Sequence, residues 1–192
     1  MTDEELVERH VGEGYETMEP IIASTAVAAS PADVWAAISA PGNLTRIHPF
    51  CERNEVSIWD GAASRDHVHY YSGVHYQREF LDWLDGVGYD LVLGPPEART
   101  ALVRWRIGEP GPATAPTTAA DASGCEFAIK VVALLRHDVP ADQREYYAEH
   151  MIRRPLPSYL DSVVRGTGYF AETGTPVTKN QFGPHPIYSP AD

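Results

Sequence analysis

The side chains best suited to chemistry lie between Arg65 and Glu79. Arg65, His67 and His69 alternate along one run, and Glu79 follows beyond a short turn. Side chains two positions apart in a strand point to the same face of a sheet. Imidazole, guanidinium and carboxylate groups on one face could transfer protons, hold a metal ion or bind the polar end of a ligand. His69 and Glu79 are therefore the candidate catalytic residues.

A metal ion is one possible partner for the two histidines. His67 and His69 could supply two ligands, and a third would have to come from His48, Cys51 or Glu79. The chain contains no HExxH or CxxC motif, whose spacing would bring metal ligands together. We therefore expect no metal, and because no cofactor fingerprint is present we expect no cofactor.

Arg65 and Glu79 have two interpretations. A buried pair in an apolar pocket could anchor the carboxylate or carbonyl group of a ligand. A pair at the edge of a sheet would be a structural salt bridge. The residues alone favour neither interpretation.

The elements that position these residues follow a simple order. Ile21–Ala28 reads as a strand, and Ser30-Pro31-Ala32-Asp33 starts a helix that ends near Ser39, because serine caps, proline suits the first turn and Asp33 completes a capping box. A second short helix is expected over Asn43–His48. From Cys51 to Arg136 the hydrophobic period is two, which is typical of strands.

One long helix follows the strands, from about Pro140 to Ala171. Pro155 and Pro157 are expected to kink it, since each removes a backbone donor and clashes one turn back. Glu109–Ser123, rich in Pro, Ala and Thr, is expected to be a loop without a function of its own. We divide the chain into a polar arm over residues 1–19, one domain over residues 20–173 and a tail over residues 174–192.

Composition excludes several classes of function. The 192-residue chain carries 27 acidic and 15 basic residues, for a net charge of −12. This disfavours nucleic acid and anionic membrane surfaces as partners. No apolar run is long enough for stable membrane insertion. Two cysteines and no signal sequence predict a cytoplasmic protein, and we expect a monomer or a homodimer.

Four short segments resemble one known superfamily. They are Ser30–Ser39, Arg65-Asp66, Gln77–Leu81 and His137–Pro140. Together with the element order, they resemble the START-like helix-grip superfamily, also called SRPBCC, which includes polyketide cyclases, lipid-transfer domains and pollen allergens. The resemblance implies an α+β fold, in which a curved antiparallel sheet of six to seven strands wraps around a long C-terminal helix, with two short helices after the first strand.

The inner face of such a sheet would line a cavity of several hundred Å³, the usual range for small-molecule sites. Trp105 and Phe127 should point inward, because arginine and lysine side chains alternate with them. The resemblance suggests that Arg65, His67 and His69 also point inward, with Glu79 and Leu81 opposite them. In that case Trp83 and Tyr89 would point inward as well. The predicted ligand-binding residues are His48, Arg65, His67, His69, Glu79, Leu81, Trp83, Tyr89, Trp105, Phe127, Tyr147 and Met151.

The sequence therefore predicts a protein that binds a hydrophobic small molecule, such as a lipid, a polyketide or an aromatic compound. The alternative is an enzyme of the polyketide cyclase or aromatase type, in which a pocket histidine or Glu79 moves protons while Arg65 or a tyrosine steadies an enolate oxygen. A third interpretation is a non-catalytic module that binds a protein partner through the Ser72–His75 turn.

Overall fold

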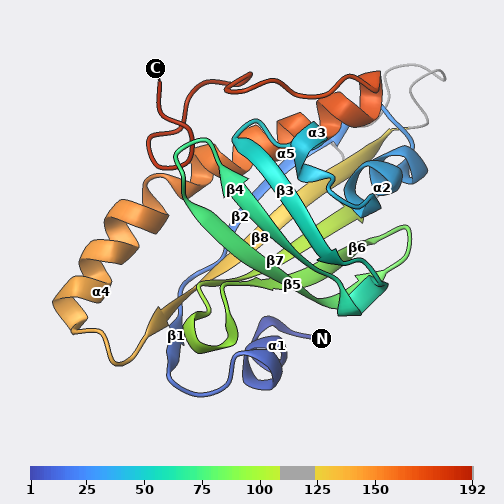
Figure 1. Ribbon diagram of the computed structural model, residues 1–192. Coiled ribbons are helices and arrows are strands. Elements are labelled where there is room, and N and C mark those ends of the chain that lie inside the picture. The colour runs from blue at the N-terminus through green and yellow to red at the C-terminus, as the bar shows by residue number, and fades with distance from the viewer. Residues whose placement is uncertain (109–123, 192) are drawn as a thin grey trace.

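The computed structural model describes residues 1–108 and 124–191 (Figure 1). The predicted loop Glu109–Ser123 lies outside the described residues. The strands are β1 Tyr15–Thr17, β2 Ile21–Val27, β3 Cys51–Ile58, β4 Arg65–Tyr70, β5 His75–Leu84, β6 Gly88–Leu93, β7 Ala101–Gly108 and β8 Cys125–Arg136. The helices are α1 Asp3–His10, α2 Pro31–Ser39, α3 Leu44–Ile47, α4 Ala141–Tyr147 and α5 Leu156–Thr173, and Gly61–Ala63 and Pro96–Ala98 form single 3₁₀ turns.

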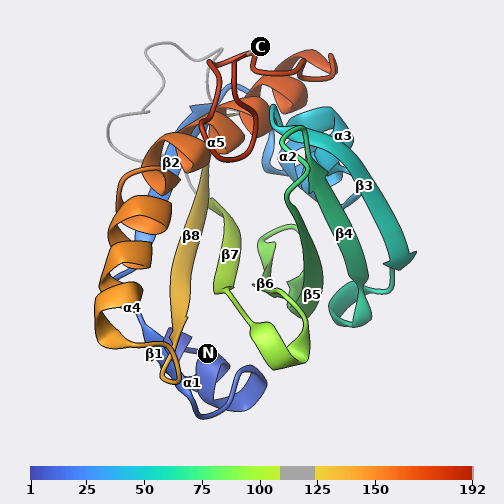
Figure 2. The same cartoon turned by 60° about the vertical axis from the view of Figure 1, so that its left-hand side comes forward.

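All strands of the described chain belong to one antiparallel sheet, in the order β1-β8-β7-β6-β5-β4-β3, with β2 also paired to β8. The sheet curves around α5 (Figure 2), which confirms the α+β helix-grip fold. The described residues form eight strands instead of six or seven. The additional strand is β1, which pairs with the end of β8 and comes from the predicted N-terminal arm.

The start of α2 follows the predicted capping box. The Ser30 hydroxyl oxygen accepts a hydrogen bond from the Asp33 amide at 3.2 Å, and the Asp33 carboxylate accepts one from the Ser30 amide at 3.3 Å. Pro31 occupies the first helical position, where its missing N–H costs nothing. The chain then turns through α3 and delivers His48 to the inner side of the sheet.

The C-terminal helix is interrupted where the prolines predict it. A π-helical turn over Ala148–Arg153 separates α4 from α5, and Pro155 precedes the first residue of α5. Within α5, a Cβ atom on Gly166 would lie 2.4 Å from the Ile47 carbonyl oxygen. Only glycine therefore allows α5 to approach the backbone of α3 this closely.

The C-terminal tail runs back over the body of the fold. The Val177 amide donates to the Arg46 carbonyl at 2.8 Å, and the Asn180 amide donates to the Pro49 carbonyl at 3.0 Å. Figure 2 shows the end of the tail between α5 and β4. The division of the chain at residues 19 and 173 remains a prediction, but both flanking segments lie against the sheet and its helices.

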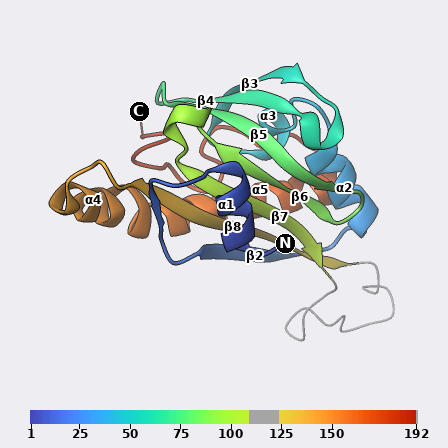
Figure 3. The same cartoon turned by 90° about the horizontal axis from the view of Figure 1, so that it is seen from below.

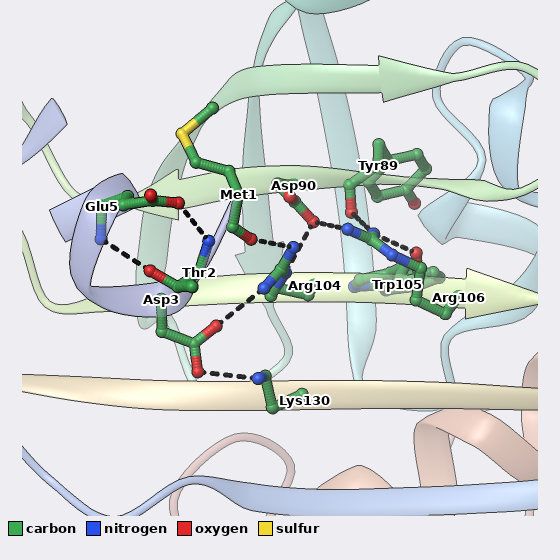
Figure 4. Close-up of polar contacts among 10 residues, drawn as sticks. All are labelled: Met1, Thr2, Asp3, Glu5, Tyr89, Asp90, Arg104, Trp105, Arg106 and Lys130. Atoms are coloured by element: carbon green, nitrogen blue, oxygen red, sulfur yellow. Dashed lines mark hydrogen bonds and ion pairs between the residues drawn. The ribbon is translucent and has the colours of Figure 1, made fainter. Parts of the chain in front are cut away.

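The helix α1 packs on part of the outer face of the sheet (Figure 3). Leu6 is fully buried there against Val92, Leu102 and Val132. Two ion pairs hold the start of α1, because Asp3 accepts hydrogen bonds from Arg104 at 2.9 Å and from Lys130 at 2.7 Å (Figure 4). Within the described residues, no helix is long and apolar enough to span a membrane.

Candidate functional site

A cavity of about 100 Å³ lies between the inner face of the sheet and α5. Its walls are mostly apolar, and they include Val68, Leu91, Val103, Ile129, Val131, Leu160 and Val163. Large aromatic side chains also project into it: Tyr70, Tyr76, Trp105, Tyr159 and Tyr188. The cavity is smaller than the several hundred Å³ expected from the sequence because these rings occupy much of the space between the sheet and the helix.

Four of the predicted ligand-binding residues line this cavity, namely His48, Trp105, Tyr147 and Met151. Three others point to the same inner face but lie beside the cavity. Phe127 and Tyr89 are fully buried, and their rings lie 5.5 and 5.4 Å from the ring of Trp105. Trp83 is partly buried and stacks on Tyr89 at 5.6 Å.

The predicted inward orientation of the β4–β5 hairpin is wrong. Arg65, His67, His69, Glu79 and Leu81 alternate with the inward residues and do not line the cavity. Val68 and Tyr70 of β4, and Tyr76 and Arg78 of β5, line it instead. Trp83 nevertheless points inward, because a β-bulge between Phe80 and Asp82 shifts the alternation by one residue.

On the outer face, the hairpin residues have structural partners. Arg65 and Arg99 both bind Glu79, at 3.3 and 2.6 Å. His69 lies 3.2 Å from Glu55 of β3. Leu81 packs against the cluster around Leu6, under α1. His67 is half-buried on the same face and pairs across the sheet with Gln77.

The inner face holds its own ion pair, which the sequence did not reveal. Arg78 donates from Nε to Asp66 Oδ1 at 2.7 Å and from Nη2 to Asp66 Oδ2 at 2.5 Å, and both side chains are buried. Asn43 adds an acceptor 3.4 Å from Nη2. Burial alone would lower the pKa of Arg78, but the Asp66 carboxylate raises it above its usual value. The pair therefore stays ionised and adds no net charge to the cavity.

A hydrogen-bonded chain runs from the backbone to two phenol groups at the cavity wall. The Phe50 amide donates to His48 Nδ1 at 3.1 Å, so the proton of the neutral imidazole sits on Nε2. Nε2 then donates to the Tyr159 hydroxyl at 2.9 Å. The hydroxyls of Tyr159 and Tyr70 lie 2.7 Å apart and share one hydrogen bond.

The ionisation states of His48, Tyr70 and Tyr159 follow from their burial. Burial, together with the positive charge of Arg78, lowers the pKa of His48 to about 3. Burial also raises the pKa values of Tyr70 and Tyr159 well above the ordinary value. At neutral pH the imidazole is uncharged and both phenols keep their protons.

A count of donors shows that the hydrogen-bonded series His48–Tyr159–Tyr70 leaves one phenol proton unused. The two phenols hold two protons, and the hydrogen bond between them uses one. His48 supplies its own proton to Tyr159, so it offers no acceptor to the second phenol proton. Among the residues that the structure describes, the second proton of the pair has no acceptor hydrogen bond. The wall of the cavity can therefore donate a hydrogen bond to an oxygen atom inside.

Several of these residues could have been found from the sequence. In β4, the set Asp66, Val68 and Tyr70 contains two large apolar side chains, whereas the set Arg65, His67 and His69 contains none. Tyr188 gave no such signal, because the tail has no periodic pattern. Within the described ranges no cluster of three or more His, Cys, Asp or Glu side chains is assembled, and the expected absence of a metal remains a prediction.

Comparisons with known proteins support the fold. No protein-family model matches the chain, and no curated protein matches it in sequence. A truncated norcoclaurine synthase from Thalictrum flavum is 14% identical, with a TM-score of 0.58 over 83% of this chain and 96% of that one. The protein TTHA0849 from Thermus thermophilus is also 14% identical, with a TM-score of 0.59 over 80% of this chain and 97% of that one.

A second structure of the Thalictrum flavum enzyme contains dopamine and hydroxybenzaldehyde, and it is 14% identical, with a TM-score of 0.56 over 82% of this chain and 87% of that one. The likeness of these structures confirms the resemblance to the START-like helix-grip fold. At this level of identity, the likeness establishes the fold and leaves function to the site itself.

Proposed function

We propose that this protein binds a neutral, largely apolar small molecule that carries a hydroxyl or carbonyl oxygen. The observation that carries the proposal is the unused phenol proton of the Tyr70–Tyr159 pair at the wall of an apolar cavity. A buried donor without an acceptor is unfavourable, so a ligand oxygen that accepts this proton would be bound in preference to a hydrocarbon of the same shape.

The charges around the cavity favour a neutral ligand. Arg78 is already neutralised by Asp66, and His48 carries no charge. A carboxylate would therefore enter an apolar interior without a free cation to pair with it, which is costly. Arg65 and Glu79, which in one of their two interpretations would anchor the carboxylate or carbonyl group of a ligand, do not line this cavity.

An aromatic ligand fits the walls best among the three classes expected from the sequence. The rings of Tyr70, Tyr159 and Trp105 line the cavity, and aromatic rings favour offset or edge-to-face contact with another ring. The solved structure of norcoclaurine synthase with dopamine and hydroxybenzaldehyde supports this choice, because both of those molecules are single aromatic rings that bear hydroxyl groups.

An enzymatic role is the second candidate, and the hydrogen-bonded chain from His48 to Tyr70 favours it. A phenol held in an apolar site can stabilise the negative charge that develops on a carbonyl oxygen when an enolate forms. In this alternative, Tyr70 and Tyr159 are the residues in contact with the reacting oxygen, and His48 orients Tyr159. His69 and Glu79 lie too far around the sheet, on its outer face, to take part.

The binding proposal is tested by calorimetric titration with 4-ethylphenol and ethylbenzene, which differ only in the hydroxyl group. We expect 4-ethylphenol to bind about tenfold more tightly, since one hydrogen bond contributes about 1–1.5 kcal/mol. The double variant Tyr70→Phe/Tyr159→Phe, which removes both phenol protons, should reduce this preference severalfold. Tyr71→Phe is the matched control, because Tyr71 is the exposed neighbour and does not line the cavity. Failure of the wild-type protein to bind either compound would refute the proposal.

The enzymatic candidate is tested by NMR in D₂O with 4-hydroxyacetophenone, whose methyl protons exchange through an enolate. Catalysis predicts faster deuterium incorporation with the wild-type protein than with Tyr70→Phe/Tyr159→Phe, which lacks both phenol groups. Equal rates with both proteins and with buffer would leave binding as the function. The cytoplasmic location and the monomeric or homodimeric state remain predictions.

A further inference from the structure

The C-terminal tail contributes one side chain to the cavity. Tyr188 lines the cavity, and its ring centre lies 4.6 Å from that of Tyr70 and 4.7 Å from that of Tyr159. The tail therefore touches the same two phenols that define the polar end of the site. We infer that Tyr188 sets the size of the ligand and restricts the site to a single aromatic ring, an inference that rests on the proposed function.

Tyr188 is held in place from both sides of the cavity. On the helix side, His185 Nε2 donates to the Pro155 carbonyl at 3.1 Å, just before α5 begins. On the sheet side, the Ser72 amide donates to the Tyr188 carbonyl at 3.1 Å, in the turn between β4 and β5. The tail thus bridges the two walls across the open side of the sheet, as Figure 2 shows.

The turn that presents Tyr188 is itself ordered by hydrogen bonds. His185 and Ser189 pair through both backbone amides at 2.9 Å. The amides of Ile187 and Tyr188 both lie 3.3 Å from His185 Nδ1 and donate to it. Further back, the guanidinium of Arg165 lies 4.6 Å from the ring centre of Phe182. Because these contacts do not involve the Tyr188 ring, shortening that side chain should leave the tail in place.

The volume of the cavity indicates how much a ligand can occupy. With Tyr188 present, about 100 Å³ is open. An apolar cavity of about 150 Å³ engineered in another protein binds one benzene ring. The cavity here is smaller than that one, so it takes at most one ring and leaves no room for a second ring joined to it. The phenol ring of Tyr188 occupies the space that a second ring would need next to Tyr70 and Tyr159.

The test compares 4-ethylphenol with 4-phenylphenol, which share a phenol group and differ by one ring. We expect the wild-type protein to bind 4-ethylphenol and to bind 4-phenylphenol at least tenfold more weakly. Tyr188→Ala should improve the affinity for 4-phenylphenol at least tenfold. Tyr188→Phe should keep the wild-type preference, because it retains the ring and removes only the hydroxyl group.

Ile187→Ala is the matched control, since Ile187 lies in the same turn and does not line the cavity. Its ligand preference should equal that of the wild type. Thermal unfolding of each variant reports whether the fold is intact, and binding of 4-ethylphenol by Tyr188→Ala shows that its site is still formed.

The outcomes separate this inference from the proposed function. If the wild-type protein binds neither phenol, the proposed function fails. If it binds 4-ethylphenol, and Tyr188→Ala still excludes 4-phenylphenol while it retains 4-ethylphenol, the function stands and the role of Tyr188 is overturned. Equal binding of both phenols by the wild-type protein would also overturn that role.

Discussion

The two faces of the sheet use similar residues for different purposes. On the outer face, the buried carboxylate of Asp90 binds Arg104 at 3.1 Å and Arg106 at 2.5 Å, and Arg104 continues to Asp3 of α1 (Figure 4). On the inner face, Asp66 binds Arg78, and Asn43 lies beside the pair. Both faces therefore carry buried arginine–carboxylate pairs, so such pairs do not by themselves mark a binding site.

The difference between the faces lies in what their polar groups leave unused. On the outer face, Asp3 forms ion pairs with Arg104 and Lys130 that hold α1 on the sheet. Leu6 fills the apolar contact beside these pairs. On the inner face, a cavity remains and one proton of the Tyr70–Tyr159 pair has no acceptor in the described part of the chain. A site is indicated by unused hydrogen-bonding capacity next to open volume.

The largest expected effect is on the inner ion pair. Asp66→Ala would leave Arg78 buried without its carboxylate, and we expect a loss of about 3–5 kcal/mol in the free energy of unfolding. Asp3→Ala is the outer-face counterpart, and it should cost about 1 kcal/mol or less because the Asp3 pairs are partly exposed to solvent. Urea denaturation measures both, and equal losses would contradict the contrast between the faces.

The second prediction separates stability from binding. Leu6→Ala removes a fully buried side chain under α1 and should cost about 2–3 kcal/mol in the free energy of unfolding. The affinity for 4-ethylphenol should stay within about twofold of the wild-type value, because the Leu6 cluster lies on the opposite side of the sheet from the cavity. A large loss of affinity in a folded variant would show that the two faces are coupled.

The third prediction concerns pH. The pKa of His48 is about 3 in the folded protein, whereas an unfolded histidine has a pKa near 6.5. As the pH falls, His48 therefore takes up a proton in the unfolded state before it does so in the folded state. Its contribution to the free energy of unfolding is complete above about pH 6.5 and is lost as the pH drops toward 3. Between pH 7 and pH 5 we expect His48 to account for a loss of about 2 kcal/mol.

His48→Gln tests this contribution, because glutamine keeps an N–H donor and does not titrate. The free energy of unfolding of this variant should fall less steeply between pH 7 and pH 5 than that of the wild type. Some slope should remain, since burial also lowers the pKa of His185. Identical slopes for the two proteins would show that His48 is not buried as described.

The smallest expected effect is at Arg65, and it tests which face the hairpin presents. Arg65 is half-exposed and paired with Glu79 on the outer face. Arg65→Ala should change the free energy of unfolding by about 0.5 kcal/mol or less, and the affinity for 4-ethylphenol by less than about twofold. A loss of affinity as large as that of the double variant Tyr70→Phe/Tyr159→Phe would mean that Arg65 faces the cavity.

Parts of this fold could be predicted because the information is local. Ser30 and Asp33 cap α2 through contacts three residues apart, and Pro155 and Pro157 lie where the last helix is interrupted and α5 begins. Trp105 and Phe127 could be placed inward because charged residues alternate with them along β7 and β8. In each case, residues close in the sequence are sufficient to predict the end of the helix or the orientation of the strand.

The orientation of the β4–β5 hairpin was harder to read, because only Val68 and Tyr70 of β4 indicate its inner face. Its inner set contains Asp66 and Arg78, which are tolerated inside only because they neutralise each other across the two strands. The bulge after Phe80 then reverses the alternation within β5. Such compensation between distant residues leaves no periodic signal, and the same holds for Tyr188, which reaches the cavity from the tail.

The central claim is that a neutral aromatic ligand binds on the inner face, with its oxygen at the Tyr70–Tyr159 pair. A crystal structure of the protein with 4-ethylphenol tests it most directly. We expect the ring inside the cavity and the ligand oxygen about 2.7–2.8 Å from the hydroxyl of Tyr70 or Tyr159. A ligand bound on the outer face near Arg65 and Glu79, with the inner cavity unchanged, would contradict it.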